Sequence, residues 1–276
     1  MEVPYGMKLT NVALIVVIVF LCFMVIDDVK TGELWAITIQ QSKLNNVLDN
    51  AVEDAMIQFV ETDSVRDIVI NKEEAVNQFF TSVFINMDIM ENPALKRQFS
   101  LYVPVIAVID EDGFYLYYTN EETVQGEKRI NQIFTQKYNY TQTYDNYKIS
   151  YTLGDYIYVS NLSTGQLMEG NYHDIREQCY ISHLMDDQLF EEERRKVIVN
   201  LLKERMTLFI NQHNRIAKFY GIKYEFTLPQ IEKEEWYRSI DDIGMIVFFQ
   251  GYPYGGRERG FYNRVIIGGA RVRKDT

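Results

Sequence analysis

An unbroken apolar run near the N-terminus constrains this chain more than any other feature. Fifteen consecutive residues, Val12 to Ile26, are apolar, and residues 9–11 extend the run to about eighteen, near the minimum for a helix that crosses ~30 Å of hydrocarbon. A buried core helix is one alternative, but a soluble helix usually keeps a polar face. A cleaved signal peptide is another, but no small-x-small cleavage site follows the run. We therefore predict an uncleaved signal anchor over residues 12–29.

The charges beside the run predict its orientation. Lys8 precedes the apolar residues, whereas Asp27 and Asp28 follow them directly. Positively charged flanks tend to stay on the cytoplasmic side of a membrane. We therefore expect residues 1–11 to form a short cytoplasmic lead of a single-pass cell-membrane protein, and the chain beyond the anchor to be extracellular.

Charge and cysteine content narrow the class of protein. The net charge is −11, which argues against a nucleic-acid partner because a phosphate backbone attracts a basic surface. Of the two cysteines, Cys22 lies in the predicted anchor and Cys179 lies outside it. The predicted exterior part therefore has no intramolecular disulfide, which favours a bacterial surface protein over an animal secreted domain.

A helical stripe follows the anchor. Its apolar residues recur at intervals of three, one and four, which predicts an amphipathic stalk helix over residues 30–62, with its firmest part from 33 to 61 and able to continue the membrane helix. We take the first residues of the stripe as an interface with other proteins: Leu44, Val47, Leu48, Ala51 and Val52.

The remainder, residues 63–276, predicts one extracellular α+β domain with an antiparallel sheet and packed helices. Asn71 and Glu74 form a capping-box pattern at the start of a helix. An Asp-Gly turn at Asp112 and Gly113 between two apolar runs predicts a hairpin. The other expected elements are a short helix at 94–99, strands at 147–153, 156–160, 222–227, 245–250 and 264–268, and a short helix at 231–237.

A long helix is expected from Asp186 or Asp187 to Tyr220, with Gly221 as its C-terminal cap. Several residues are expected to mark its main face: Ile198, Leu201, Leu202, Arg205, Leu208, Phe209 and Phe219.

Few residues suggest a catalytic or metal-binding site. His173, Cys179 and His183 fall within eleven residues and are the weak candidates for a metal site, but zinc would need further ligands, and ordinary surface histidines with a buried cysteine are the favoured alternative. The acidic turn at residues 110–112 could bind a cation, yet a hairpin turn alone explains it. Nucleotide-binding, HExxH, GxSxG and CxxC motifs are lacking. We therefore expect no metal, no cofactor and no enzymatic activity.

A glycine-rich loop, Gly255 to Gly260, carries two arginines beside aromatic residues. A phosphate-binding loop would precede a helix, whereas here a strand is expected. Because exposed aromatics and arginine are common interface anchors, Tyr254, Arg257 and Arg259 are candidate partner-binding residues, with a plain loop as the alternative.

The first 60 residues resemble type IV pilin-like proteins, particularly TadE-like pseudopilins, in having a short lead, one apolar helix and an amphipathic continuation such as LNNVLDNAVEDA at residues 44–55. The segment YVPVIAVIDEDGFYLYY at 102–118 is similar to surface proteins of clostridial-type bacteria. The pilin resemblance implies lateral packing through the membrane helix and a role in a pilus or its assembly. It also implies cleavage between Gly6 and Met7, although the glutamate of that family falls at Asn11 here.

The segment VIDEDGFYLYY at 108–118, behind a membrane helix and a long helix, also looks similar to extracellular Cache-like sensor domains. That resemblance implies a ligand-binding module that acts through a partner protein. Our leading hypothesis is a pseudopilin-like component of a bacterial appendage or secretion system, and the sensor module is the alternative. Expected partners are membrane or pilus-assembly proteins, the bilayer through residues 12–29, and a second copy of the chain.

Overall fold

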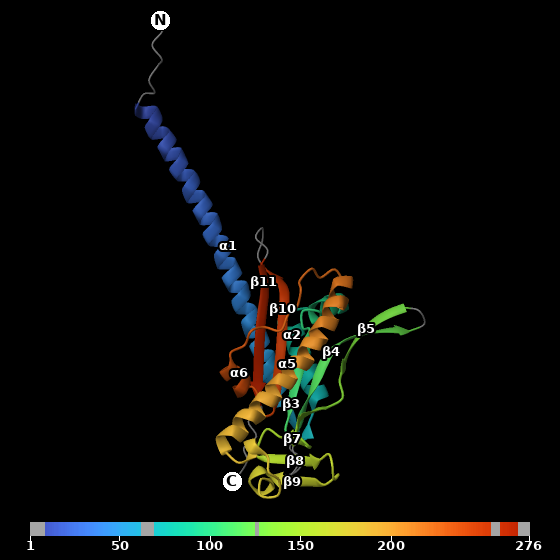
Figure 1. Ribbon diagram of the computed structural model, residues 1–276. Helices are drawn as coiled ribbons and strands as arrows, with labels where there is room; N and C mark the ends of the chain where they lie inside the picture. Colours follow the sequence, from blue (N-terminus) through green and yellow to red (C-terminus); the bar gives the residue numbers. More distant parts are fainter. Residues whose placement is uncertain (1–8, 62–68, 125–126, 255–259, 270–276) are drawn as a thin grey trace. The chain divides into compact units, whose positions relative to one another are not determined.

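The structure is a computed structural model that describes residues 9–61, 69–124, 127–254 and 260–269 (Figure 1). The chain divides into two units, one formed by 1–46 with 253–261 and the other by 47–252 with 262–276. The predicted cleavage position at Gly6 and Met7 lies outside the described residues.

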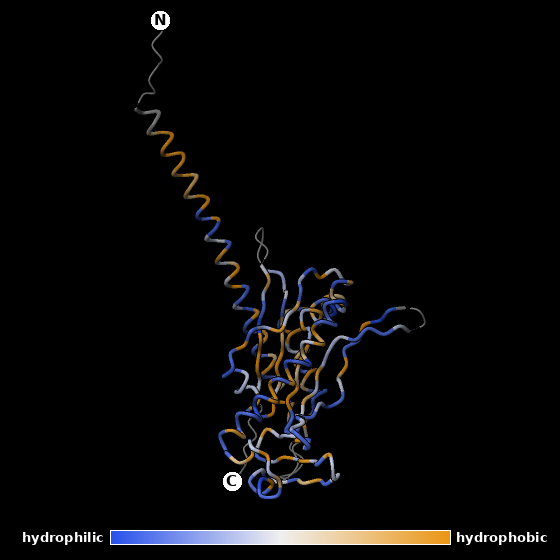
Figure 2. The backbone as a smooth tube through the Cα atoms, in the orientation of Figure 1, coloured by the Kyte–Doolittle hydropathy of each residue, from blue (hydrophilic) through white to orange (hydrophobic). Residues whose placement is uncertain are grey.

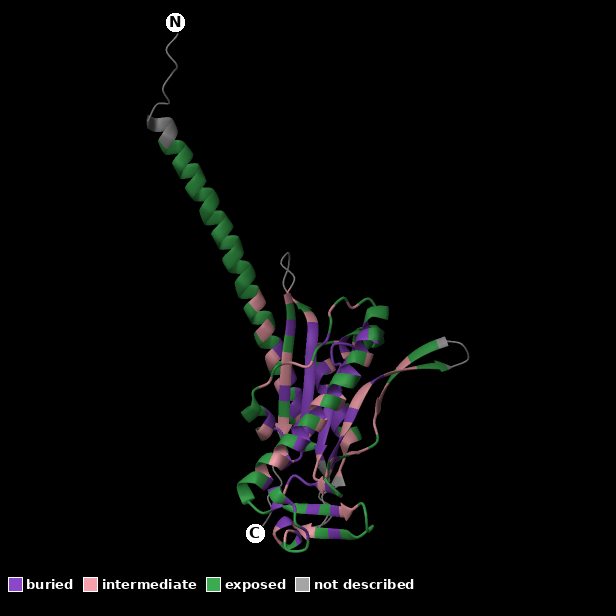
Figure 3. Ribbon diagram, viewed as in Figure 1, coloured by how far each residue is buried: buried purple, intermediate pink, exposed green. Residues whose placement is uncertain are grey.

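The first helix, α1 (Leu9–Ile57), is uninterrupted and covers both the predicted anchor and most of the predicted stalk. Its early part is apolar (Figure 2), and every large apolar side chain from Leu14 to Ile26 is exposed (Figure 3). Among the residues searched, those that the structure describes, no helix offers a stretch long and apolar enough to cross a membrane. The anchor at 12–29 therefore stays a prediction.

The second unit is built on a nine-stranded sheet, and the structure confirms the α+β class. The strand order is β11-β10-β3-β4-β6-β7-β8-β9, with β5 paired to β4, and the described pairings are antiparallel. The strands are β3 (Val105–Asp110), β4 (Gly113–Val124), β5 (Glu127–Phe134), β6 (Tyr138–Tyr144), β7 (Tyr147–Tyr151), β8 (Tyr156–Asn161), β9 (Leu167–Asn171), β10 (Gly244–Tyr254) and β11 (Gly260–Gly269).

Helices cover both faces of this sheet. The helices that follow α1 are α2 (Lys72–Asn86), α3 (Pro93–Ser100), α4 (Tyr172–Ile175), the 3-10 turn η1 (Ser182–Leu184), α5 (Asp187–Phe219) and α6 (Lys233–Arg238). Strands β1 (Val60–Glu61) and β2 (Val69–Ile70) form a separate ribbon. On β4, the ring of Tyr117 lies 6.2 Å from that of Phe80 on α2, and the ring of Tyr118 lies 4.2 Å from that of Phe209 on α5. Because successive strand residues point to opposite faces, α2 and α5 cover opposite faces.

The last turns of α1 belong to the core. A Cβ on Gly268 of β11 would collide with Val52 and approach Met56 closely, so glycine permits the close approach of helix and strand. The carboxylate of Asp49 accepts an ion-pair hydrogen bond from Arg264 at 2.8 Å. The five stripe residues predicted as an interface, Leu44, Val47, Leu48, Ala51 and Val52, are all buried. Their side chains are therefore not presented to a separate partner.

Most predicted elements are confirmed. The side chain of Asn71 caps α2, and that of Asp186 caps α5, while Gly221 follows α5 with φ +82°. The predicted hairpin is β3–β4, with Asp110 paired to Gly113. The strands predicted at 147–153, 156–160, 245–250 and 264–268 correspond to β7, β8, β10 and β11, and the short predicted helices correspond to α3 and α6.

Three predictions differ from the structure. The stalk helix expected to reach residue 61 or 62 ends at Ile57, because Val60 and Glu61 pair with β2 as strand β1. Residues 222–227 form no strand, because amide side chains replace a strand partner: Asn214 pairs with both backbone groups of Phe226, and Gln250 pairs with both of Thr227. The predicted face of α5 is also partly wrong. Ile198, Leu202 and Phe209 are buried, but Leu208 and Phe219 are exposed; the buried stripe runs instead through Arg194, Met206, His213 and Ala217.

Candidate functional site

The residues proposed for a metal site have separate partners. His173 is partly exposed, with its Nδ1 3.8 Å from a carboxylate oxygen of Asp187. The thiol of Cys179 is buried against the carbonyl oxygen of Ile175 at 3.4 Å, and burial raises its pKa. Within the described ranges, no group of three or more His, Cys, Asp and Glu residues is placed to hold a metal ion.

His183, the third of these candidates, lies in a buried hydrogen-bond chain. Its Nε2 is 2.9 Å from the hydroxyl of Tyr151, which donates to Gln142, and the amide of Gln142 donates to Glu193 at 3.0 Å. Burial lowers the pKa of His183. These hydrogen bonds connect β6, β7, η1 and α5.

The acidic turn between β3 and β4 is occupied by a lysine. The ammonium of Lys137 lies 2.6 Å from a carboxylate oxygen of Asp110 and also pairs with Asp112. Burial opposes the charge of Lys137, but the hydrogen bonds to both carboxylates outweigh that effect and raise its pKa. The carboxylates expected to bind a cation therefore bind the ammonium group of Lys137.

The glycine-rich loop is described only in part. Tyr254 at the end of β10 is partly buried, whereas Arg257 and Arg259 lie outside the described residues. The interface expected for this loop stays a prediction.

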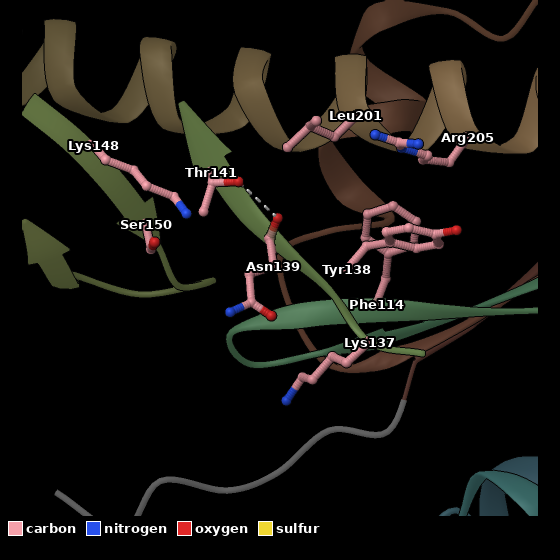
Figure 4. A pocket seen from close by; sticks show the side chains of 9 residues that line it. All are labelled: Phe114, Lys137, Tyr138, Asn139, Thr141, Lys148, Ser150, Leu201 and Arg205. Atoms are coloured by element: carbon pink, nitrogen blue, oxygen red, sulfur yellow. Dashed lines mark hydrogen bonds between the residues drawn. The ribbon is translucent and has the colours of Figure 1, made fainter. Parts of the chain in front are cut away.

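The structure instead brings together a basic pocket beside α5, within the second unit (Figure 4). Its volume is about 270 Å³. Three of its nine lining residues are basic and none is acidic, in a protein with a net charge of −11. The lining residues are Phe114, Lys137, Tyr138, Asn139, Thr141, Lys148, Ser150, Leu201 and Arg205.

A close crossing of two strands forms the floor of the pocket. In the described pairing, β4 meets β6 at Gly113–Asn139 and Phe114–Tyr138. A Cβ on Gly113 would lie 2.5 Å from the carbonyl oxygen of Tyr138, far inside van der Waals contact, so only glycine permits this approach. The crossing places the rings of Phe114 and Tyr138 with their centroids 5.4 Å apart.

The strands beyond the crossing supply polar groups. Thr141 of β6 pairs with Ser150 of β7, and Lys148 lies two residues before Ser150. Because strand side chains alternate between faces, Lys148 and Ser150 share a face, while the intervening Ile149 is fully buried on the other. Lys148 and Ser150 therefore lie on the solvated face of the sheet, and the opposite face lies in the core.

Helix α5 forms the remaining wall with Leu201 and Arg205, which lie one turn apart. The guanidinium carbon of Arg205 is 5.0 Å from the centre of the Tyr138 ring, a cation–π distance. Its one described ion pair, with Glu204, is long at 3.9 Å. Arg205 was expected on the main face of this helix, and the structure places it at the border between core and pocket.

The three cations are not equivalent. Lys137 is neutralised by Asp110 and Asp112, and Figure 4 shows its side chain directed away from Arg205 and Lys148. Within the described part of the chain, Lys148 makes no ion pair. Figure 4 shows Lys148 and Arg205 on opposite sides of the lining residues, so the two charges do not converge on one point. Comparisons of the chain with protein-family models, with curated proteins and with solved structures give no match.

Proposed function

We propose that this protein is a membrane-anchored, extracellular structural or assembly component of a bacterial surface appendage or secretion system, with a pseudopilin-like architecture. One observation carries the proposal: a single helix, α1, begins with exposed apolar residues and ends with residues buried in an α+β domain. Such a helix can serve a lipid bilayer with one end and a folded domain with the other.

The exposed part of α1 is costly in water. Phe20 and Phe23 are 64% and 73% exposed, and Leu14 and Val25 are similarly exposed. Burial of one such side chain in an apolar phase is favourable by about 1.5–3 kcal/mol. A helix that is apolar on all sides is typical of a lipid or fully buried environment, so lipid is the proposed surrounding.

The length of the run sets how it would span. Fifteen apolar residues at ~1.5 Å each cover about 22 Å, less than ~30 Å of hydrocarbon. The proposed span therefore includes residues 9–11 and reaches the headgroups at Asp27 and Asp28. Lys8 would then lie on the cytoplasmic side, and the domain outside.

In an assembly role, the membrane helix would pack laterally against other membrane helices. Because the amphipathic stripe at 44–52 is buried, contacts with pilus-assembly proteins or with a second copy would use the exposed part of α1 and the domain surface. Helices in a bilayer associate by close packing along one face.

Cysteine cross-linking in membranes tests this packing. The only cysteines are Cys22, exposed on α1, and Cys179, buried. In a Cys22→Ser background of the full chain, a cysteine is placed in turn at positions 20–24, and the membranes are oxidised mildly. We expect cross-linked species from one helical face only, to a second copy or to another membrane protein. Absence of cross-links at all five positions would contradict an assembly role.

The alternative is a Cache-like ligand-binding module that acts through a partner protein. The basic pocket is the observation that favours it. A ligand that binds the native state would raise the melting temperature of the full chain. Cross-linking in membranes without any such rise would favour the assembly role alone.

A further inference from the structure

We infer that the exposed face of β7, β8 and β9 binds a neutral sugar, with Tyr158 stacking against the sugar ring and Lys148 and Glu169 hydrogen-bonding to its hydroxyls. The site is a hollow of about 550 Å³ on this face. It is distinct from the pocket beside α5, although Lys148 and Ser150 line both. This inference concerns the sheet face alone and holds or fails independently of the anchored role.

The register of the sheet brings the lining side chains together. Strands β7, β8 and β9 lie side by side at one end of the second unit (Figure 1). Tyr158 of β8 lies directly opposite Ser150 of β7 and Glu169 of β9, so these three residues form one row. The adjacent row, two residues along each strand, consists of Lys148, Ser160 and Leu167. Because side chains directly opposite each other have Cβ atoms about 4.5–5.5 Å apart, the two rows form one continuous surface.

An exposed tyrosine ring lies in the middle of this surface. The alternate residues Ile149 and Val159 are fully buried on the core face, whereas Tyr158 is 42% exposed on the other face. The ring of Tyr156 lies 5.3 Å from that of Tyr158 in an edge contact, which supports the position of the Tyr158 ring. Many sugar rings have one face that carries several C–H groups, and the negative face of an aromatic ring attracts such groups.

The polar side chains of the two rows have unused hydrogen-bonding capacity. Within the described ranges, no protein group forms a hydrogen bond or ion pair with the side chains of Lys148, Ser150, Tyr158, Ser160 and Glu169. On the core face, by contrast, Tyr151 donates to Gln142. A lysine ammonium only donates, a carboxylate only accepts, and a hydroxyl does both. This mixed set suits sugar hydroxyls, which also donate and accept.

The balance of charge favours a neutral ligand. Lys148 and Glu169 are the charged residues that line the hollow, so their formal charges cancel. A ligand with a single charge of either sign is repelled by one of them. Burial raises the pKa of Tyr158, and the nearby carboxylates of Asp112 and Glu169 raise it further. Its hydroxyl is therefore neutral at pH 7 and can also bind a sugar hydroxyl.

Spacing argues against a zwitterion such as a free amino acid. Lys148 and Glu169 lie in different rows and two strands apart, which at ~4.8 Å per strand separates their backbones by about 10 Å or more. Two charges so far apart match groups on opposite edges of a ring better than the adjacent charges of an amino acid. The volume, equal to about eighteen water molecules at ~30 Å³ each, leaves room for one or two sugar rings.

The test uses the full chain in a detergent without a sugar headgroup, with micelles alone as the blank. The methyl glycosides of glucose, galactose, mannose and N-acetylglucosamine are titrated by saturation-transfer NMR. Sorbitol is the matched probe, because it has the hydroxyls of a sugar but no ring. We expect saturable binding of at least one glycoside and at least tenfold weaker binding of sorbitol.

Substitutions then locate the site. Tyr158→Ala should weaken glycoside binding at least tenfold, whereas Tyr158→Phe, which keeps the ring, should change it less than threefold. Glu169 is exposed, so Glu169→Ala should weaken binding at least threefold without changing the melting temperature of the unliganded protein. The matched control is Tyr180→Ala, because Tyr180 is 88% exposed and does not line the hollow; it should change affinity less than twofold.

Four results would overturn the site: no saturable binding of any of the glycosides, equal binding of sorbitol, unchanged affinity in both Tyr158→Ala and Glu169→Ala, or an equal loss in Tyr180→Ala. A loss in Tyr158→Phe as large as that in Tyr158→Ala would overturn the stacking role of the ring.

Discussion

His213 shows how a single residue makes this domain sensitive to acid. Its side chain is fully buried, with Nε2 2.9 Å from the carbonyl oxygen of Leu101 and Nδ1 3.3 Å from the hydroxyl of Thr119. A carbonyl only accepts hydrogen bonds, so Nε2 donates, and Nδ1 accepts from the hydroxyl in the neutral ring. Burial lowers the pKa of His213 to about 4, although the bond to Leu101 opposes that effect.

The native state should therefore lose stability as pH falls from 6.5 towards 4, because the unfolded chain takes up a proton that the native ring resists. A lowering from 6.5 to about 4 corresponds to about 3 kcal/mol. His183, whose pKa burial also lowers, adds a smaller loss in the same direction. Urea unfolding at pH 7 and pH 4.5 measures this loss of stability. His213→Gln should lose clearly less stability between these pH values than the wild type, and an equal loss would refute the assignment.

Gly268 tests the contact between α1 and β11 at the same scale. Gly268→Val should destabilise the domain by more than 1 kcal/mol, since the new side chain collides with Val52 and Met56. Gly269→Val is the matched control, because nothing lies within 4 Å of a Cβ there. Urea unfolding midpoints compare the two variants, and equal midpoints would show that α1 does not pack against this strand.

At the scale of elements, α1 has two different environments. Leu48 is fully buried, whereas Ile57 on the same helix is 74% exposed. Leu48→Asp should abolish cooperative unfolding or cost at least 3 kcal/mol, because an unpaired carboxylate enters an apolar core. Ile57→Asp should cost less than 1 kcal/mol. Circular dichroism during urea unfolding distinguishes the two variants. A folded Leu48→Asp protein of normal stability would contradict the burial of Leu48 in the core.

Elements with strong local signals could be predicted from the sequence. The β3–β4 hairpin has a two-residue Asp-containing turn between apolar runs, and α5 has both a capping Asp186 and a terminal Gly221. The strand predicted at 222–227 is wrong because the side chains of Asn214 and Gln250, not a neighbouring strand, bind the backbone groups there. Strand β6 was not predicted, since its YNYTQTY sequence is polar on its exposed face and lacks an apolar run.

The pocket beside α5 could not be predicted from the sequence, because its lining residues come from distant parts of the chain. Phe114, Lys148 and Arg205 lie on three elements widely separated in the sequence, and only the sheet register and the position of α5 bring them together. The alternation of Lys148 and Ser150 in a predicted strand was a signal for a polar face, but nothing local indicated that a helix would cover its rim. The three clustered candidates, His173, Cys179 and His183, were near in sequence and have separate partners instead.

The central proposal for the whole molecule is that the first part of α1 lies in a membrane. Alkaline extraction of membranes from cells that produce the full chain tests it most directly, with a Val17→Asp, Phe20→Asp double variant as the comparison, since both residues are exposed on α1. We predict that the wild type stays in the membrane pellet and that the variant moves to the supernatant as a folded protein. Release of the wild-type chain into the supernatant would contradict the anchored role.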